Sequence, residues 1–254
     1  MRTSSQSQAP APAQRPIATL PEYFQREDQR LDFVRAIFDR TARDYDRVER
    51  LMSFGTGAWY RRQALLRAGL KPGMRVLDVA TGTGLVAREA VGISGDRSAV
   101  LGLDPSAGMM QGLSGSLGIA LVQAQAERLP LADGAFDFLS MGFALRHVAD
   151  LGAVFGEYRR VLRPGGIVCI LELTRPERAW STYLLKLYLR GVVPTLSRVV
   201  ARNPQTPRLF RYFWDTIEAC VPPARVVQAL EAAGFEGVRR HVEARVFSEY
   251  TARR

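Results

Sequence analysis

The sequence predicts an α/β fold built on a mostly parallel sheet. Two observations carry this prediction: from Met74 onward, short apolar runs alternate with helical stretches, and a glycine-rich turn follows the first run. A helix ended by Gly234 and a last pair of strands complete the pattern. The earlier strand candidates are MRVLDVA, AVLGLD, IALVQA, FDFLSMGF and GIVCILEL.

Two segments precede the sheet. Residues 1–19 are rich in Ser, Gln, Ala and Pro and lack apolar periodicity, so we expect a disordered tail. Residues 20–72 contain apolar residues at helical spacing, which predicts an N-terminal helical cap. These residues are Leu31, Val34, Ile37 and Phe38.

The sheet domain should span residues 73–254, with a helical insert at about 175–222. Within the insert, WSTYLLKLYLRGVV places Lys186 and Arg190 four residues apart. A different helical face carries Trp180, Tyr183, Leu184, Leu187 and Tyr188. The pattern fits a helix packed on the sheet and equally a surface helix that covers a substrate.

Composition limits the class of protein. Two cysteines, Cys169 and Cys220, form neither a metal-ligand spacing nor a disulfide framework, so we expect no structural metal and a reducing, cytoplasmic location. Charges interrupt every apolar run before the roughly 20 residues that span a bilayer. At most, we expect peripheral contact with a membrane.

The positive charge is concentrated in one region. The net charge is +10, and residues 159–211 contain eleven Lys or Arg against two acids, Glu172 and Glu177. A solvated basic face explains this, as does contact with an anionic membrane. Nucleic acid is disfavoured because no RNA-binding module accompanies the arginines.

The turn after the first strand, VLDVATGTG, is built to approach a ligand. Gly82 and Gly84 fit a dinucleotide fingerprint, but Ala80 and Ala87 do not, and the Gly-Lys-Ser/Thr ending of a phosphate loop is missing. Asp78 can orient the turn or attract a cationic ligand. Because Gly82 and Gly84 have no side chain, we expect them to leave room for the ligand's main chain.

A second strand, AVLGLDPS, ends in Asp104 about 20 residues later. A carboxylate there can accept both hydroxyls of a ribose, as in adenosine-containing ligands. Asp104 as a helix cap and Gln125 as a solvated loop residue are the structural alternatives. The joint order of the two acid-ended strands favours a cofactor site.

These motifs resemble class I S-adenosylmethionine-dependent methyltransferases, and four stretches resemble the ubiquinone/menaquinone biosynthesis C-methyltransferases. IFDRTARDYDRVERLMSFG is similar to that family's N-terminal signature, and VLDVATGTG to its glycine motif. AERLPLADGAFD and GFALRHVAD are similar to its AEALPFPDNSFD and FGLRNV stretches. Together they cover about residues 33–173.

The resemblance implies a Rossmann-like fold with a seven-stranded, mostly parallel sheet and helices on both faces. It also implies S-adenosylmethionine as methyl donor and a quinol or related phenolic acceptor. Gly142 stands opposite the family's usual serine. The cofactor-binding candidates are Asp78, Ala80, Gly82, Thr83, Gly84, Asp104, Pro105, Gln125, Ala126 and Gly142.

Arg146 and His147 follow the fourth strand, in a loop that the family pattern turns toward the acceptor. Arg146 could hold a phenolate oxygen, or it pairs with Asp150 or a backbone carbonyl. His147, with an ordinary pKa near 6.5, could accept the phenolic proton where the family usually has Asn, or it simply packs. Tyr45 and Asp46 complete the catalytic candidates. The further pocket candidates are Trp59, Tyr212 and Trp214.

Three departures from the family pattern concern segments expected to border the acceptor. TGAWYRR replaces a His-containing stretch of the family, and NPQTPRLFRYFWDTIEACVPP replaces its usual DADSYRYLAESI. The family's C-terminal HRG is absent, and the chain ends in FSEYTARR. O- or N-methylation of a specialised metabolite, a cofactor-binding scaffold without turnover and a nucleic-acid-binding protein are the alternative functions. A homodimer is compatible with the sequence.

Overall fold

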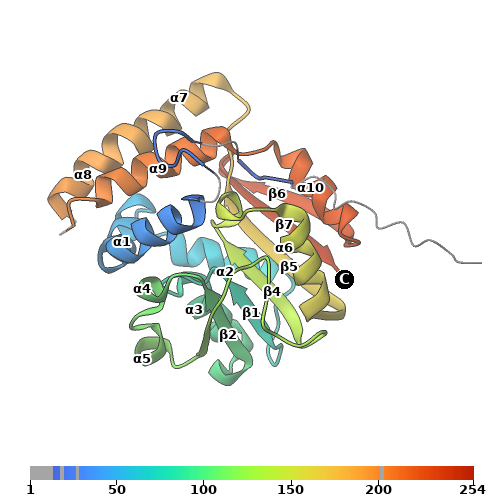
Figure 1. The fold of residues 1–254 in the computed structure, drawn as a ribbon. Coiled ribbons are helices and arrows are strands. Elements are labelled where there is room, and N and C mark those ends of the chain that lie inside the picture. Colours follow the sequence, from blue (N-terminus) through green and yellow to red (C-terminus); the bar gives the residue numbers. More distant parts are fainter. Residues whose placement is uncertain (1–13, 18–19, 27–28, 201–202) are drawn as a thin grey trace, which may run out of the picture.

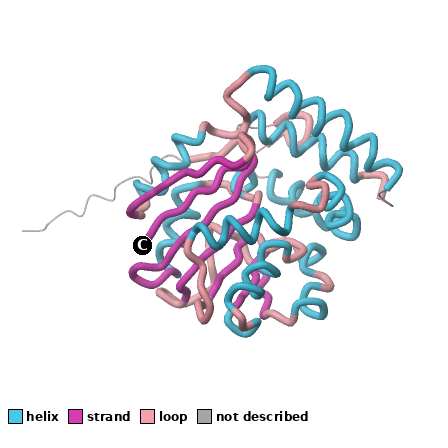
Figure 2. The backbone as a smooth tube through the Cα atoms, turned by 180° about the vertical axis from the view of Figure 1, so that it is seen from behind, coloured by secondary structure: helices cyan, strands magenta, loops and turns pink. Residues whose placement is uncertain are grey.

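The computed structural model describes residues 14–17, 20–26, 29–200 and 203–254. Within these residues one sheet of seven strands has the order β3-β2-β1-β4-β5-β7-β6, with β7 antiparallel to both of its neighbours and the remaining pairs parallel. Figure 2 shows the strands as one twisted layer. The strands are β1 Val76–Val79, β2 Val100–Asp104, β3 Ala120–Gln123, β4 Phe136–Gly142, β5 Leu162–Leu173, β6 Glu236–Glu243 and β7 Phe247–Arg253.

Helices cover both faces of this sheet and its carboxyl edge (Figure 1). The helices are α1 Arg30–Met52, α2 Gly57–Ala68, α3 Leu85–Ser94, α4 Ala107–Met110, α5 Leu113–Leu117, α6 Leu151–Val161, α7 Ala179–Leu187, α8 Val193–Val200, α9 Thr206–Ala219 and α10 Pro223–Ala232. Short stretches η2 Arg97–Ala99 and η3 Leu145–His147 are 3₁₀-helical, and η4 Tyr188–Val192 is π-helical. The predicted Rossmann-like arrangement is confirmed.

Three apolar clusters hold the layers together. On one face of the sheet, α6 and α10 contribute Phe155 and Leu230. On the other face, α2 and α3 contribute Leu65 and Ala90. The third cluster joins α1 to the insert helices and includes the fully buried Trp214. The insert therefore packs on α1, above the strand ends.

The segment predicted as an N-terminal cap divides between two layers. Helix α1 lies beside the insert, whereas α2 packs on α3 and against β5. Tyr60, Ala64 and Leu65 explain the second placement because they form one buried face of α2 within the sheet's core. Residue 72 is thus not a boundary in packing.

The start of the chain also differs from the predicted tail at residues 14–17. The backbone oxygens of Gln14 and Pro16 accept hydrogen bonds from Leu151 and Val221, and Ile17 is buried in a β-bridge with Cys220. One apolar side chain and paired backbone groups fix this short stretch. The rest of the predicted tail, residues 1–13 and 18–19, lies outside the described residues.

The strand order reverses between β1 and β4. Because β2 and β3 lie on one side of β1, and β4 and β5 on the other, the chain leaves the sheet in opposite directions from β1 and β4. Ligands of open α/β sheets bind at such a point, outside the carboxyl ends of the strands. The ends of β1, β2 and β4 are therefore where a site is expected.

Candidate functional site

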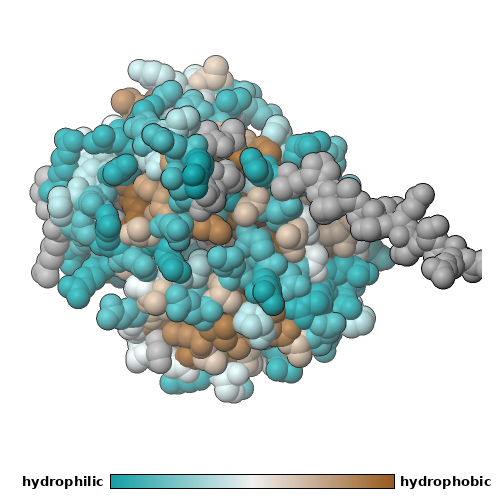
Figure 3. Space-filling view, in the orientation of Figure 1, coloured by the Kyte–Doolittle hydropathy of each residue, from teal (hydrophilic) through white to brown (hydrophobic). Residues whose placement is uncertain are grey.

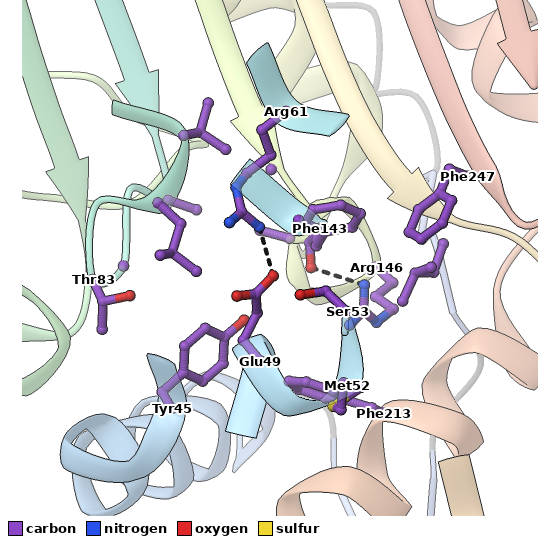
Figure 4. Close-up of a pocket in the computed structure, with 18 of the residues that line it drawn as sticks. Tyr45, Glu49, Met52, Ser53, Arg61, Thr83, Phe143, Arg146, Phe213 and Phe247 are labelled. Atoms are coloured by element: carbon purple, nitrogen blue, oxygen red, sulfur yellow. Dashed lines mark hydrogen bonds and ion pairs between the residues drawn. The ribbon is translucent and has the colours of Figure 1, made fainter. Parts of the chain in front are cut away.

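A cavity of about 520 Å³ opens at this position. Its wall combines the turn after β1, the end of β2, the loop after β4, helices α1 and α2, and the insert. Figure 4 shows side chains from these elements converging on one space. The volume lies within the range of about 300–1,000 Å³ that is typical of small-molecule sites.

The turn after β1 is held from below by Asp78. Its carboxylate accepts hydrogen bonds from Thr81 Oγ1 and Ser140 Oγ, both at 2.7 Å. Burial raises the pKa of Asp78 to about 6, although these two hydrogen bonds oppose the shift. Asp78 does not line the cavity, so of its two predicted tasks the structure favours orienting the turn.

Asp104 at the end of β2 faces the cavity. Its two oxygens accept hydrogen bonds from the backbone N–H groups of Gly82 and Ser106, each at 2.8 Å. Burial raises the pKa of Asp104 to about 6, and the same two N–H groups partly offset the effect. Each carboxylate oxygen keeps acceptor capacity for a ligand hydroxyl. The geometry fits the predicted ribose contact.

A smaller cavity of about 100 Å³ adjoins the first one. Gln125 and Ala126 line it, and Ala80 and Pro105 line both cavities. The predicted cofactor residues thus form a continuous path from the glycine turn past Asp104 to Gln125. Such a path suits an elongated ligand with a ribose at its centre.

Of the three glycines predicted at the cofactor site, two line the cavity and one does not. Gly84 does not line the cavity, because a Cβ there would lie 2.3 Å from Leu113 Cδ1: the space beside it is filled by packing. Gly142 does line the cavity, and a Cβ there would lie 2.6 Å from Val86 Cγ2. Gly82 retains its predicted place, with φ +56° in the turn.

Helix α1 is fixed to the cofactor side by its acids. Asp46 accepts a hydrogen bond from the hydroxyl of Thr83, and Asp39 accepts one from Ser106. Thr83 lines the cavity whereas Asp46 does not, which makes Asp46 a residue that positions the turn. Tyr45 lines the cavity, and burial raises the pKa of its hydroxyl to about 12.

Arg146 is buried and already bound within the protein. Its Nη1 contacts Glu172 Oε1 and donates to the backbone oxygen of Phe143 at 2.8 Å, while Nε donates to Thr216 Oγ1 at 3.1 Å. The expected carbonyl partner is present, but the acid is Glu172, since Asp150 instead caps α6. Arg146 also lines the cavity, where its charge is balanced by buried Glu172.

His147 is a neutral residue packed among aromatic rings. Its ring stacks on Tyr212 at 5.4 Å between centroids and makes an edge contact with Phe38 at 5.5 Å. Burial, followed by the nearby Arg146 and Arg30, lowers the pKa of His147 well below 6.5. This environment supports the packing interpretation and makes His147 a weak proton acceptor.

The remaining aromatic candidates separate into two groups. Trp59 lines the cavity and is 62% exposed, so it stands at the rim. Tyr212 and Trp214 are fully buried behind the wall and do not line it. Tyr212 supports His147 with a contact of 3.2 Å between its hydroxyl and Nδ1.

The sequence did not reveal a charged pair inside the cavity. Glu49 of α1 and Arg61 of α2 form an ion pair, with 2.7 Å between Oε1 and Nη1 (Figure 4). The available signal was the spacing of Tyr45, Glu49 and Met52 on one face of α1. Among the described residues, no group of His, Cys, Asp or Glu could hold a metal ion.

The path lined by the glycine turn, Asp104 and Gln125 fits S-adenosylmethionine. Asp104 is a buried carboxylate that faces the cavity with unused acceptor capacity, as adenosine hydroxyls require. Thr83 and the turn border the same space. When bound there, the cofactor supplies an electrophilic methyl group.

A comparison with protein families finds that residues 24–246 match the model of the ubiE/COQ5 methyltransferase family. The chain belongs to this family. A protein of Coxiella burnetii described as ubiquinone/menaquinone biosynthesis C-methyltransferase UbiE is 32% identical over 223 residues, covering 84% of this chain and 87% of that protein. A Mycobacterium protein described as demethylmenaquinone methyltransferase is 35% identical, covering 81% and 86%.

Solved structures agree on the fold. A SAM-dependent methyltransferase of Aquifex aeolicus superposes with a TM-score of 0.59 at 21% identity, covering 82% of this chain and 97% of that one. Family membership and fold together make this protein an S-adenosylmethionine-dependent methyltransferase. No helix of the described residues is long and apolar enough to cross a membrane.

We expect Asp104→Asn to weaken binding of S-adenosylhomocysteine by about 10- to 100-fold, because the ligand loses hydrogen bonds to a charged acceptor. Wild-type affinity should fall as the pH drops through about 6, because protonation removes the anion, and the variant should lack this component. Calorimetric titration checks both. The exposed Asp133→Asn is the control, and an unchanged affinity in Asp104→Asn would contradict the assignment.

Gly142→Ser should reduce the free energy of unfolding by about 1–3 kcal/mol, because its Cβ would overlap Val86. Val86→Ala introduced into the same chain should recover part of this loss by making space. Denaturant unfolding of the wild type and the three variants measures the coupling. Equal losses for Gly142→Ser with and without Val86→Ala would show that Val86 is not the obstacle.

Proposed function

We propose that this methyltransferase transfers a methyl group to a ring carbon of a quinol or related phenol. The observation that carries the proposal is the apolar part of the cavity, which continues from the cofactor path. Its wall includes Met52, Phe143, Phe213 and Phe247, which suit a flat, apolar ring. The two relatives described above are named for methylation in quinone biosynthesis, which supports the same acceptor class.

The chain's contribution to such a reaction is mainly positioning. A ring carbon becomes nucleophilic when the neighbouring hydroxyl loses its proton and its electrons delocalise into the ring. The wall must hold that carbon against the methyl group and exclude water. The guanidinium of Arg146, whose charge is balanced by Glu172, borders the cavity and can orient the ring by donating to its oxygen. Afterwards the hydrogen of the methylated carbon leaves as a proton and aromaticity returns.

Incubation with S-adenosylmethionine and a panel of quinols and polar phenols tests this function. We expect products with the new methyl group on ring carbon, identified by mass and by carbon NMR, and faster turnover of the apolar quinols. Methyl groups on oxygen or nitrogen would replace our proposal with the alternative reaction. Tight cofactor binding without any product would indicate a scaffold that no longer methylates.

We further propose that α7 and α8 bring the protein to an anionic membrane that holds a lipidic acceptor. Exposed apolar side chains of α7 include Trp180, Tyr183 and Leu187. Arg178 and Arg198 are exposed on the same segment. Figure 1 places these helices in the outermost layer, and Figure 3 shows hydrophobic groups among hydrophilic ones along that edge. Such helices bind interfaces through apolar area and basic charge.

The double variant Tyr183→Ser/Leu187→Ser should bind less to vesicles that contain phosphatidylglycerol, because it removes exposed apolar area. Flotation of protein with these vesicles, and with phosphatidylcholine vesicles, measures the bound fraction. Val242→Ser, at an exposed apolar residue of β6, is the matched control. Equal flotation of wild type and double variant would contradict the proposal. Light scattering could show instead that the wild type is a dimer and that the double variant is not. The exposed apolar side chains of α7 would then be a dimer contact.

A further inference from the structure

Glu49 is placed differently from the other acids of the cavity. Among the described residues three carboxylates line it: Asp104, Glu49 and Glu243. Asp104 is engaged by the turn, and Glu243 stands at the rim, 42% exposed. Glu49 is 24% exposed and lies at the centre of the space in Figure 4, between Tyr45 and Arg61.

Arg61 holds only one of the two oxygens of Glu49. Its guanidinium is 5% exposed on α2, and Nη1 donates to Oε1 at 2.7 Å. The other oxygen, Oε2, has no hydrogen-bond partner among the residues that the structure describes. A carboxylate with one oxygen fixed and the other unpaired is oriented to accept a hydrogen bond from a donor in the cavity.

The chain leaves space for this pair at one position. A Cβ on Gly57 would lie 2.3 Å from Glu49 Oε1 and 3.1 Å from Arg61 Nη1. The backbone of Gly57 is outside the positive-φ region, so its conformation does not require glycine. The absent side chain instead leaves room for the carboxylate of Glu49 in its present position beside Arg61. Gly57 belongs to TGAWYRR, one of the stretches that depart from the family pattern.

The other polar groups that face this space are poor proton acceptors. Arg146 and Arg61 are cations that only donate. Tyr45 stays protonated at neutral pH because burial raises its pKa to about 12. His147 is kept neutral and weakly basic by burial and its arginine neighbours. Glu49 remains as the anion close to the apolar wall.

We propose that Glu49 accepts the proton of the acceptor's ring hydroxyl and that Arg61 positions its carboxylate. The inference rests on the proposed function, since it needs a phenolic acceptor. The O–H bond breaks, the proton passes to Glu49 Oε2, and the electron pair stays with the ring and drives attack by the ring carbon. After that carbon releases its hydrogen to water as a proton, Glu49 returns the first proton to the ring oxygen. One proton per turnover reaches the solvent.

Binding tests this role without turnover. We compare the affinities of 2-naphthol and 2-methoxynaphthalene for protein saturated with S-adenosylhomocysteine. In the ether a methyl group replaces the hydroxyl proton, so that only the naphthol can donate a hydrogen bond. Wild type should bind 2-naphthol about tenfold or more tightly than the ether, through a hydrogen bond to a charged acceptor. In Glu49→Gln this preference should vanish. Arg61 holds the amide oxygen, so that the amide N–H₂ faces the ligand, and the oxygens of the naphthol and of the ether can both accept from it. Glu231→Gln, at an exposed carboxylate of α10, should keep the preference.

Gly57→Ala is the second variant, because it displaces the carboxylate without removing it. It should reduce the preference for 2-naphthol while the affinity for S-adenosylhomocysteine stays at the wild-type value. Arg61→Lys should retain more of the preference than Arg61→Gln, since a cation still holds the carboxylate. A full wild-type preference in Glu49→Gln or in Gly57→Ala would overturn the proposal.

Turnover separates this inference from the function on which it rests. If wild type makes no ring-methylated product from the quinol panel, the proposed function fails, whatever the naphthol preference. If wild type makes the product and Glu49→Gln makes it with unchanged kcat, the function stands and the role of Glu49 is refuted. We expect Glu49→Gln to lower kcat more than it raises KM for the cofactor, because Glu49 contacts the acceptor.

Discussion

The buried pair of Arg146 and Glu172 connects the carboxyl ends of β4 and β5 to the helical insert, and the aromatic wall of the cavity depends on this connection. Arg146 follows β4 and Glu172 lies near the end of β5, while the same guanidinium donates to Thr216 of α9 and lies 5.2 Å from the ring centre of Phe213. One cation thus joins two parallel strands to a helix of the insert. Removing one partner from such a buried pair typically costs about 3–5 kcal/mol. The aromatic side of the cavity depends on this joint.

The charged groups of the site fall into two regions. On the cofactor side, Asp78 and Asp104 are anions whose pKa values are raised by burial, so their ionisation at neutral pH has a cost that backbone and hydroxyl donors reduce. On the acceptor side, Arg61 and Arg146 lie next to an apolar wall, each paired with a carboxylate, Glu49 and Glu172. A cationic donor would lie beside the anions of the first region, and a phenolic ring would lie beside the ion pairs of the second.

The sheet could be predicted from the sequence because its signals are local. Apolar runs mark the strands, and the acids that end two of them mark the cofactor edge, which is why Asp104 was predicted there. Gln125 was predicted from the resemblance to the family. The partner of Arg146 could not be predicted from the sequence, because Glu172 becomes its neighbour only when β4 and β5 pair. The displaced role of Gly84 likewise reflects packing against a residue of α5. The contacts that the sequence missed depend on which elements become neighbours, and spacing along the chain does not encode that.

The empty position at Gly57 has a consequence for how this lineage could diverge. With an acid at residue 49 paired to Arg61, a side chain at 57 would have to shift the carboxylate, because its Cβ would lie 2.3 Å from Glu49 Oε1. The two positions are therefore coupled: a side chain at 57 and the acid at 49 fit together only if the carboxylate moves from its present contact with Arg61. Substitutions at residues 49 and 57 should therefore have non-additive effects, because each changes the space available to the other.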